Sequence, residues 1–132
     1  MIKIRSLLIA LLCFLGISLL IYGCNSSSGS PKELIEKYFM SAIKQDYTTT
    51  YSCYYAAYKK KVNAEEYVRH RKEASLLQSY KIVSLNVDVD KAQAEVELTF
   101  GPSEKLNRKE PVTTVVKEDM IKEHGEWKIK VW

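Results

Sequence analysis

The residues that could do acid–base or nucleophilic chemistry are few and widely spaced in this 132-residue chain. Its two histidines are His70, inside a basic run, and His124, next to a glycine in an expected turn, and neither is expected inside a pocket. Asp119 lies in an expected strand. If its side chain faced the core, loss of water would raise the carboxyl pKa and make the group a general base. We favour a cross-strand ion pair with a lysine instead, and therefore predict no catalytic residue.

The cysteines do not form a disulfide framework or a zinc-binding pattern. Cys13 lies in an apolar N-terminal stretch, Cys24 follows that stretch, and Cys53 stands alone among tyrosines. There is no C-x-x-C pair and no cluster of cysteine with histidine, so we expect no structural metal and no cofactor. A lone cysteine in such surroundings is typical of a small buried apolar residue, so Cys53 is expected in the core rather than as a nucleophile.

A row of tyrosines is the most unusual feature of the chain. The spacings of three and four place them on one side of a single expected helix. Tyrosine combines a broad apolar ring with a polar tip, which suits the rim of a small core and equally suits a binding surface. Core packing is the simpler interpretation. The alternative is an interface or pocket wall made by Tyr47, Tyr51, Tyr54, Tyr55 and Tyr58.

Three helices are expected to carry these side chains. Ser30, Pro31 and Glu33 have the spacing of a capping box with proline at the first helical position, so a helix should begin there. Asp46 is expected to cap the helix that carries the tyrosines, and Asn63 to cap a third helix. The first helix has one apolar face, formed by Leu34, Ile35, Tyr38, Phe39, Ala42 and Ile43.

From residue 79 onward the apolar period changes from about 3.6 to 2, which predicts strands. We expect strands near residues 79–89, 92–100, 112–123 and 126–132, joined by a tight turn, a charged loop and a hairpin at His124. Alternation predicts inward-facing apolar sets. In the first two strands these are Val83, Leu85, Val87, Val89, Ala92, Ala94, Val96, Leu98 and Phe100, and in the last strand Trp127, Ile129 and Val131.

The register of the last hairpin has two solutions. A two-residue turn pairs Trp127 with Lys122, whereas a three-residue loop pairs Trp127 with Ile121 and Lys130 with Glu118. One step of slip exchanges the two faces of the strand. We favour the three-residue loop because it pairs opposite charges. In either register, helices followed by an antiparallel meander predict an α+β fold, with N-terminal helices packed on a curved four-stranded sheet.

The N-terminal residues predict export and anchoring. Met1–Arg5 carries two positive charges and no acid, and Leu7–Ile21 is almost wholly apolar, as in a secretory signal. Ile21–Cys24 resembles a bacterial lipobox, which implies cleavage before Cys24 and acylation of its sulfur, so that acyl chains bind the membrane. An uncleaved membrane helix is the alternative. Both place residues 25–132 outside the cytoplasm, on the outer side of a bacterial cell membrane.

The predicted organisation is a signal peptide over residues 1–23, a lipidated cysteine with a flexible tether over 24–30, and one domain over 31–132. The tether is small and polar, with a reach of about 13 Å. Removal of Lys3 and Arg5 with the signal leaves 18 basic against 16 acidic residues, a net +2 that gives no indication of nucleic acid as a partner. The basic runs 59–61 and 69–72 are most simply solvated, with anionic lipid headgroups as the alternative.

The stretches "PKELIEKYFMSAIKQDYTTTYSC", "VNAEEYVRH" and "HGEWKIKVW" resemble small bacterial lipoproteins of the nuclear-transport-factor-2-like superfamily. This resemblance implies a cystatin-like cone. The superfamily includes isomerases, dehydratases, ligand-binding domains and envelope-assembly subunits, and its enzymes resemble one another in placing an Asp, often with His or Tyr, inside the cone.

We expect a membrane-anchored extracytoplasmic lipoprotein that is not an enzyme and binds an envelope protein or an apolar small ligand through its tyrosine-bearing side. The alternatives are an isomerase or dehydratase using an acid inside the cone, and an assembly subunit recognised by a sheet edge or aromatic patch. A closed interior filled by Phe39, Val96 and Trp127 would count against the enzyme. An open pocket joining Asp119 to a tyrosine hydroxyl would favour it.

Overall fold

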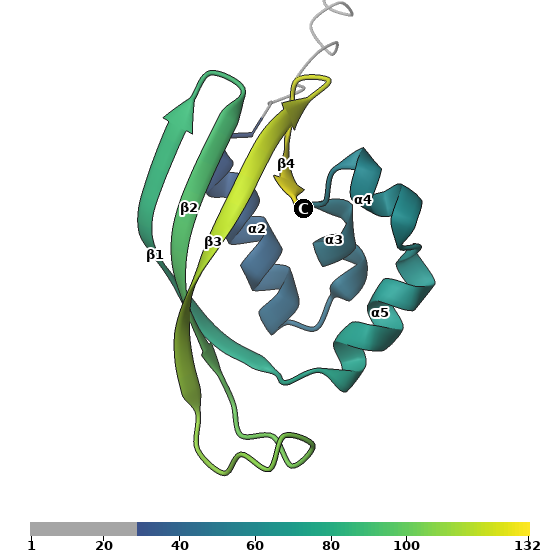
Figure 1. Cartoon of the computed structure of the whole chain (residues 1–132), viewed down its shortest axis with the longest axis vertical. Helices are drawn as coiled ribbons and strands as arrows, with labels where there is room; N and C mark the ends of the chain where they lie inside the picture. Colours follow the sequence, from purple (N-terminus) through teal and green to yellow (C-terminus); the bar gives the residue numbers. More distant parts are fainter. Residues whose placement is uncertain (1–28) are drawn as a thin grey trace, which may run out of the picture.

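The computed structural model describes residues 29–132, in which helices lie against the concave face of one curved sheet (Figure 1). The predicted α+β class is confirmed. Cys24 and the predicted signal peptide lie outside the described residues, and no helix within residues 29–132 is long and apolar enough to cross a membrane. The elements are α2 (Pro31–Ile43), α3 (Tyr47–Ser52), α4 (Ala56–Lys61), α5 (Ala64–Glu73), β1 (Leu77–Asp88), β2 (Lys91–Phe100), β3 (Val112–Glu123) and β4 (Glu126–Lys130).

Helix α2 begins as its capping signal predicts. The Glu33 backbone N–H donates to Ser30 Oγ at 3.2 Å, and the Ser30 N–H donates to the Glu33 carboxylate at 2.9 Å, while Pro31 occupies the first helical position. Its apolar face lies in the hollow of the sheet (Figure 1). The buried residues of this face include Leu34, Ile35, Tyr38, Phe39 and Ala42.

The four strands follow one another in the order β1-β2-β3-β4, each antiparallel to its neighbour. In β2 the even positions from Ala92 to Leu98 are buried against the helices, as the alternation predicts. In β4, Trp127 and Ile129 are buried, but Val131 lies beyond the end of the strand and is exposed. The prediction that Val131 also faces the core is wrong.

A register shift in β1 overturns the predicted alternation of that strand. Ile82 pairs with Val96 and Leu85 pairs with Ala94, so the inward positions change from even to odd between Ile82 and Ser84. Such a bulge inserts one unpaired residue and re-aims those that follow. Val83 occupies this irregularity and is exposed, and Val89 lies in the following turn at a positive φ of 44°. Val87, near the end of the strand, is also exposed, so the prediction that Val83, Val87 and Val89 face the core is wrong.

The β3–β4 hairpin has the two-residue turn, so the three-residue loop favoured from the charges is wrong. Trp127 pairs with Lys122, and Lys130 pairs with Asp119. His124 and Gly125, at φ values of 51° and 82°, both lie in the left-handed region that a tight twisted turn requires. This register places Met120 opposite Ile129 in the core, and burial of that side chain outweighs one exposed charge pair. As a consequence Glu118 faces the helices and Asp119 faces outward.

The tyrosines do not share one helix, because the chain extends between α3 and α4 to pair with β4. The Ile129 N–H donates to the Cys53 carbonyl at 2.8 Å, and the Tyr55 N–H donates to the Ile129 carbonyl at 3.0 Å. This parallel bridge centres on Tyr54. The prediction of one continuous helix is wrong here because the edge of β4 offers the backbone hydrogen bonds that the helix would otherwise supply.

Candidate functional site

A group of polar side chains lies inside the fold, between the helices and the concave face of the sheet. We call it the inner polar cluster. Tyr38 comes from α2, Tyr54 from the bridge before α4, and two members from α5, while β3 supplies an acid. The acid faces inward because it pairs with Ala94 of β2, which is fully buried. The cluster consists of Tyr38, Tyr54, Tyr67, Arg71 and Glu118.

The three tyrosines of the cluster meet edge to face and are almost completely buried. The hydroxyls of Tyr38 and Tyr54 are 2.6 Å apart and share one hydrogen bond. The rings of Tyr54 and Tyr67 stand at 74° to one another with centroids 5.5 Å apart. Burial raises the pKa of all three phenols well above the ordinary range. The three hydroxyls therefore stay neutral and can each donate or accept a hydrogen bond.

Two buried polar atoms of the cluster have no hydrogen-bond partner among the described residues. These atoms are Arg71 Nε and the Tyr67 hydroxyl oxygen, which lies beside the Tyr54 hydroxyl but forms no hydrogen bond of good geometry with it. A buried polar group without a partner costs about 1–3 kcal/mol, and folded proteins hold few of them. The cluster therefore offers a ligand two hydrogen-bonding groups. They are the N–H donor at Nε of the Arg71 cation and the neutral hydroxyl of Tyr67.

Glu118 has an unusual electrostatic position. Loss of water, reinforced by the nearby charge of Asp119, raises the pKa of the Glu118 carboxyl to about 7, although Arg71 acts in the opposite direction. Within residues 29–132, no ion pair or hydrogen bond engages this carboxyl. A carboxyl with a pKa near the working pH can hold or release a proton, which is the property of a general acid or base.

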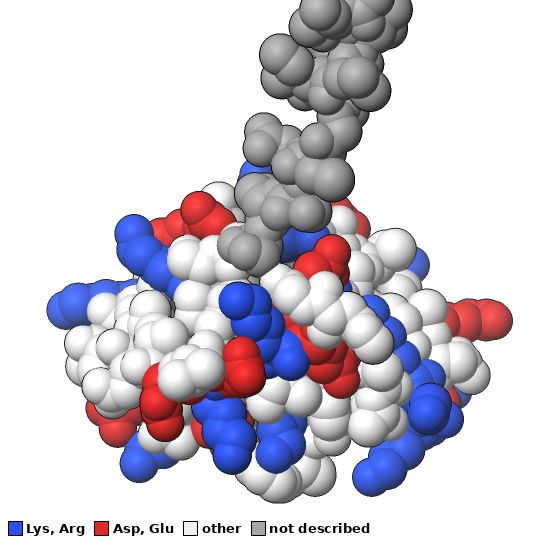
Figure 2. All heavy atoms as spheres, turned by 90° about the horizontal axis from the view of Figure 1, so that it is seen from above, with Lys and Arg blue, Asp and Glu red and all other residues white. Residues whose placement is uncertain are grey.

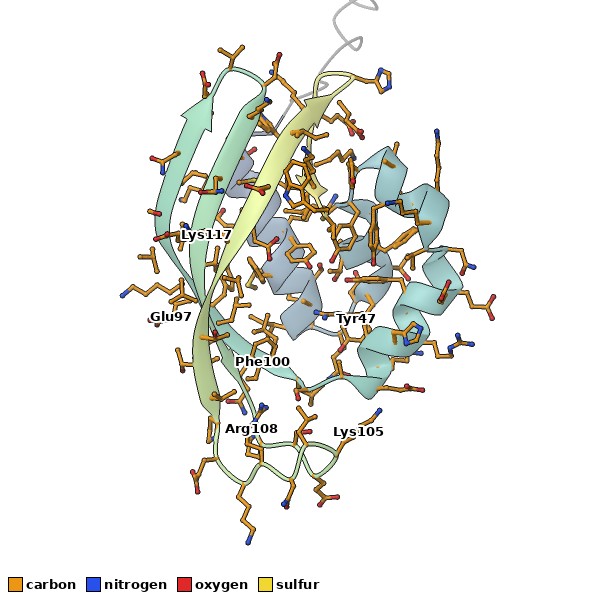
Figure 3. All side chains as sticks on the ribbon, viewed as in Figure 1. Tyr47, Glu97, Phe100, Lys105, Arg108 and Lys117 are labelled. Carbon is orange, nitrogen blue, oxygen red and sulfur yellow. The ribbon has the colours of Figure 1, made fainter. Side chains whose placement is uncertain are left out.

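The predicted tyrosine row is divided between core and periphery. Tyr47 and Tyr54 are buried, whereas Tyr51, Tyr55 and Tyr58 are half-buried. The Tyr51 hydroxyl donates to the Val62 carbonyl at 2.7 Å, and the Tyr55 hydroxyl donates to the Val131 carbonyl at 2.5 Å. Figure 3 shows Tyr47 directed into the space between α2 and α5. Only Tyr54 of this row belongs to the inner polar cluster.

Asp119 lies on the outer face of the sheet and does not meet a tyrosine hydroxyl. Its carboxylate accepts hydrogen bonds from Gln93 Nε2 and Trp132 Nε1, both at 2.8 Å. The hydrogen bond from Trp132 lowers the pKa of the Asp119 carboxyl most, and the hydrogen bond from Gln93 lowers it further. The predicted cross-strand lysine pair is replaced by these neutral donors. The same outer face carries the labelled side chains of Glu97 and Lys117 (Figure 3).

The remaining candidates lie away from the inner polar cluster. His70 is exposed on α5, with Nε2 3.8 Å from Glu66, and His124 is exposed in the hairpin turn. Cys53 is 2% exposed, as predicted, and burial raises the pKa of its thiol. Phe39, Val96 and Trp127 are all buried in the core. Among the described residues, no group of three or more His, Cys, Asp or Glu side chains is placed to hold a metal ion.

Sequence reasoning missed four of the five cluster members as site residues. It assigned Arg71 to a solvated basic run and Tyr38 to an apolar helix face, and it placed Glu118 opposite Lys130. The available signal was the turn itself, since a residue that tolerates positive φ followed by glycine favours a two-residue hairpin. That register, combined with the buried alanines of β2, would have placed Glu118 inside.

The comparisons with known proteins support the fold and leave the activity open. No model of a protein family matches the sequence, and no curated protein matches it. The fold is similar to that of NTF2-like proteins. One solved structure, described as an NTF2-like transpeptidase from Campylobacter jejuni, has 13% identity and a TM-score of 0.55, with 79% of this chain and all of that chain covered.

Two SEC-C motif proteins have higher TM-scores. The protein from Rhodopseudomonas palustris has a TM-score of 0.64 at 12% identity, with 80% of this chain and 78% of that chain covered. The protein from Psychrobacter arcticus also has a TM-score of 0.64, at 10% identity, with 84% of this chain but only 64% of that chain covered. At such identities the likeness concerns the fold alone.

Proposed function

We propose that this chain is a membrane-anchored extracytoplasmic lipoprotein whose domain binds a small ligand inside the fold, at the inner polar cluster. The sequence features that support the anchor are the basic N-terminus, the apolar stretch and the lipobox-like Ile21–Cys24. The observation that supports ligand binding is the pair of buried polar atoms without partners, Tyr67 Oη and Arg71 Nε. In this proposal the domain binds its ligand without chemically changing it.

The cluster also indicates what kind of ligand fits. The tyrosine rings would offer apolar contacts to a ligand, and the Arg71 guanidinium would offer a fixed positive charge with planar donor geometry. A ligand with an apolar or aromatic body and one acidic group would satisfy both. Such a molecule differs from the wholly apolar ligand expected from the tyrosine row alone.

Binding is tested with the fluorescent probe 1-anilinonaphthalene-8-sulfonate, which has an aromatic body and one anionic group. We expect saturable fluorescence enhancement that is weakened by roughly tenfold in Arg71→Gln, because a charge-assisted hydrogen bond contributes about 1.5–3 kcal/mol. Arg69→Gln is the matched control, since Arg69 is exposed on the same helix. Circular dichroism checks that each variant is folded. Equal binding by both variants would exclude the cluster as the site.

The anchor is tested by membrane fractionation of the full chain against Cys24→Ala. Loss of acylation should release the protein or block its processing, because the small polar tether cannot replace acyl chains in the membrane. An unchanged membrane pool of correctly processed Cys24→Ala protein would contradict the lipid anchor.

Glu118 supports a second candidate function, an acid–base enzyme of the isomerase or dehydratase type. Its carboxyl, with a pKa of about 7, lies in the same cluster as three neutral phenols. In this case Glu118 replaces Asp119 as the acid inside the cone. The distinguishing result is turnover of a ketone or hydroxyacyl substrate that Glu118→Gln abolishes while probe binding is kept.

A further inference from the structure

Strand β3 is longer than its neighbour β4, and part of it has no strand on that side. It has 12 residues, and β4 pairs only with those from Asp119 to Glu123. The residues from Val112 to Glu118 pair with β2 alone, and we call their other side the free edge. Figure 1 shows β4 ending beside α3, whereas β3 extends well beyond it.

The backbone groups of the free edge point away from β2 at every second residue. In an antiparallel ladder, one residue directs both its N–H and its C=O to one neighbour, and the next residue directs both to the other. The Lys122 N–H donates to the Asp90 carbonyl at 2.9 Å, so the even-numbered residues of β3 face β2. The N–H and C=O groups of Thr113, Val115 and Lys117 therefore face the free edge, and they have no hydrogen-bond partner among the described residues.

The exposure of the side chains agrees with an uncovered edge. Thr113, Val115 and Lys117 are all exposed, and so are the inward-facing Val112 and Thr114. The residues of β2 that pair with these five are buried or half-buried. Solvent therefore reaches this part of β3 from the side away from β2.

The opposite edge of the sheet is protected in a way that the free edge is not. β1 is the other edge strand, and its register is interrupted twice, once between Ile82 and Ser84. Bulges of this kind bend an edge strand and hinder its pairing with a further strand. β3 pairs with β2 in one continuous register from Val112 to Ile121. The free edge thus lacks this protection.

The spacing of the unpaired groups indicates what binds them. Backbone groups that repeat at every second residue, about 7 Å apart, match the repeat of another extended polypeptide chain. The side chains beside the edge on the concave face are Val112, Thr114 and Val116, so apolar or β-branched side chains of an added strand would pack there. Its alternate side chains would lie beside Val115 on the convex face, in contact with water.

A second copy of this chain fits the free edge less well than a strand of another protein. Antiparallel pairing of two copies through this edge reverses β3 of one copy relative to the other. Gly29 lines a pocket together with Glu126, next to the hairpin at which β3 ends, and Figure 2 looks onto this end of the molecule. The predicted tethers of two paired copies would therefore leave from opposite ends of the dimer.

A tether with a reach of about 13 Å disfavours that arrangement on one membrane. This step, and only this step, rests on the membrane anchor of the proposed function.

We propose that the free edge of β3 binds an extended segment of another protein, which adds a strand to the sheet in line with β4. The added strand runs antiparallel to β3 and exchanges hydrogen bonds with Thr113, Val115 and Lys117. It alternates apolar side chains on the concave face with polar side chains on the convex face. Backbone pairing supplies the affinity, and the alternation of side chains supplies the selectivity.

Amide hydrogen exchange measured by NMR tests the proposal residue by residue. The protein is the full chain in detergent micelles, and the probe is the capped synthetic peptide KTVTVTK, which alternates valine with threonine. Without the probe we expect fast exchange at Thr113, Val115 and Lys117, and slow exchange at Val116 and Glu118, whose N–H groups face β2. A probe concentration of about 1 mM should slow exchange at the first three amides by about twofold or more, as expected for half occupancy at a Kd of about 1 mM.

Val115→Pro removes the N–H at the centre of the free edge and leaves the bonds to β2 in place, because proline is tolerated in an edge strand where the N–H faces away from the sheet. The probe should no longer slow exchange at Thr113 and Lys117 in this variant. Slow exchange at Val116 and Glu118 checks that it is folded, and Thr113→Pro replaces it if it is not. The matched control is Val115→Thr, which keeps the N–H and should bind the probe as the unchanged protein does.

Each contrary result has its own meaning. If the probe does not slow the three amides, the edge does not accept a strand, and equal slowing in Val115→Pro would place the probe elsewhere. Slow exchange without the probe would show that the edge is already covered, by a second copy if the protection increases with protein concentration. Each of these results would overturn the proposal. Failure of the anchor is distinguishable, because it is measured by membrane fractionation of Cys24→Ala and leaves the exchange of these amides unchanged.

Discussion

Two neighbouring carboxyl groups, one on each face of the sheet, have pKa values shifted in opposite directions. On the concave face, Glu118 loses water and has no partner among the described residues, and its pKa rises to about 7. On the convex face, Asp119 accepts hydrogen bonds from Trp132 and Gln93, and its pKa falls. The two residues are adjacent in β3. The difference shows that the side of the strand, rather than the residue type, decides which acid is available for binding or catalysis.

The comparison extends to the surroundings of the two acids. The concave face combines buried phenols, a guanidinium and an orphaned hydroxyl, whereas the convex face carries solvated pairs such as Lys117 with Glu95, 3.7 Å apart. Solvated pairs of this kind contribute about 0–1 kcal/mol. Substitutions on the concave face should therefore have large effects, and equivalent substitutions on the convex face should have small ones.

The largest expected effect is on stability at the core beside Glu118. Met120 is 1% exposed, and Met120→Ala should lower the free energy of unfolding by about 2–5 kcal/mol through lost burial and the cavity left behind. Val115→Ala on the same strand, where Val115 is 55% exposed, should change it by no more than about 0.5 kcal/mol. Urea denaturation measures both. Equal losses would contradict the assignment of faces in β3.

The next largest effect is a pH dependence of the free energy of unfolding, caused by the Glu118 carboxyl. Because its pKa is raised on folding, the folded state binds more protons than the unfolded state, and stability falls as pH rises from about 4.5 to about 7. Glu118→Gln should remove this fall and stabilise the protein at pH 8 by about 3 kcal/mol at most, with little change at pH 4. Denaturation series at several pH values test this. An unchanged pH profile in the variant would show that Glu118 is solvated.

Two tyrosine-to-phenylalanine changes should have opposite signs. Tyr38→Phe leaves the Tyr54 hydroxyl buried without a partner, which costs about 1–3 kcal/mol. Tyr67→Phe removes a hydroxyl that already lacks a partner, and should be neutral or stabilise the fold by up to about 1 kcal/mol. Thermal denaturation compares the two. A clear loss of stability in Tyr67→Phe would mean that this hydroxyl has a partner, and the case for a ligand there would fail.

The smallest expected effect is on the convex face. Asp119→Asn should lower stability by less than about 1 kcal/mol at neutral pH, because the carboxylate exchanges its hydrogen bonds readily with water. The pKa of Asp119 is lowered on folding, so its contribution is present above its ordinary pKa and disappears as pH falls through the folded value. A loss as large as that of Met120→Ala would contradict the description of this face as solvated.

The architecture could be predicted because local signals agreed with the global fold. The capping box at Ser30 predicts a helix start, and the alternation from Ala92 to Leu98 predicts a strand with one buried face. Both occur in the structure. The approximate positions of the strands follow from the same periodicities, although the alternation within β1 and the division of the tyrosine helix into α3 and α4 do not.

The site could not be predicted because it depends on non-local pairing. One residue of register exchanges Glu118 and Asp119, and the charge argument chose the wrong register because an exposed ion pair contributes less than the burial of Met120. Arg71 lies in a basic run whose sequence gives no sign that one member faces inward. The break of the tyrosine helix at Tyr54 depends on the edge of β4, which is more than seventy residues away in the chain.

The protonation of Glu118 tests the central claim most directly. Side-chain carboxyl groups are titrated by ¹³C NMR, and the Glu118 signal is assigned by its loss in Glu118→Gln. A titration midpoint of about 7 would confirm a half-buried, unpaired acid on the concave face of the sheet. A midpoint at the ordinary value of about 4.5 would contradict it, because the carboxyl would then be solvated or paired, and the acid–base candidate function would fail.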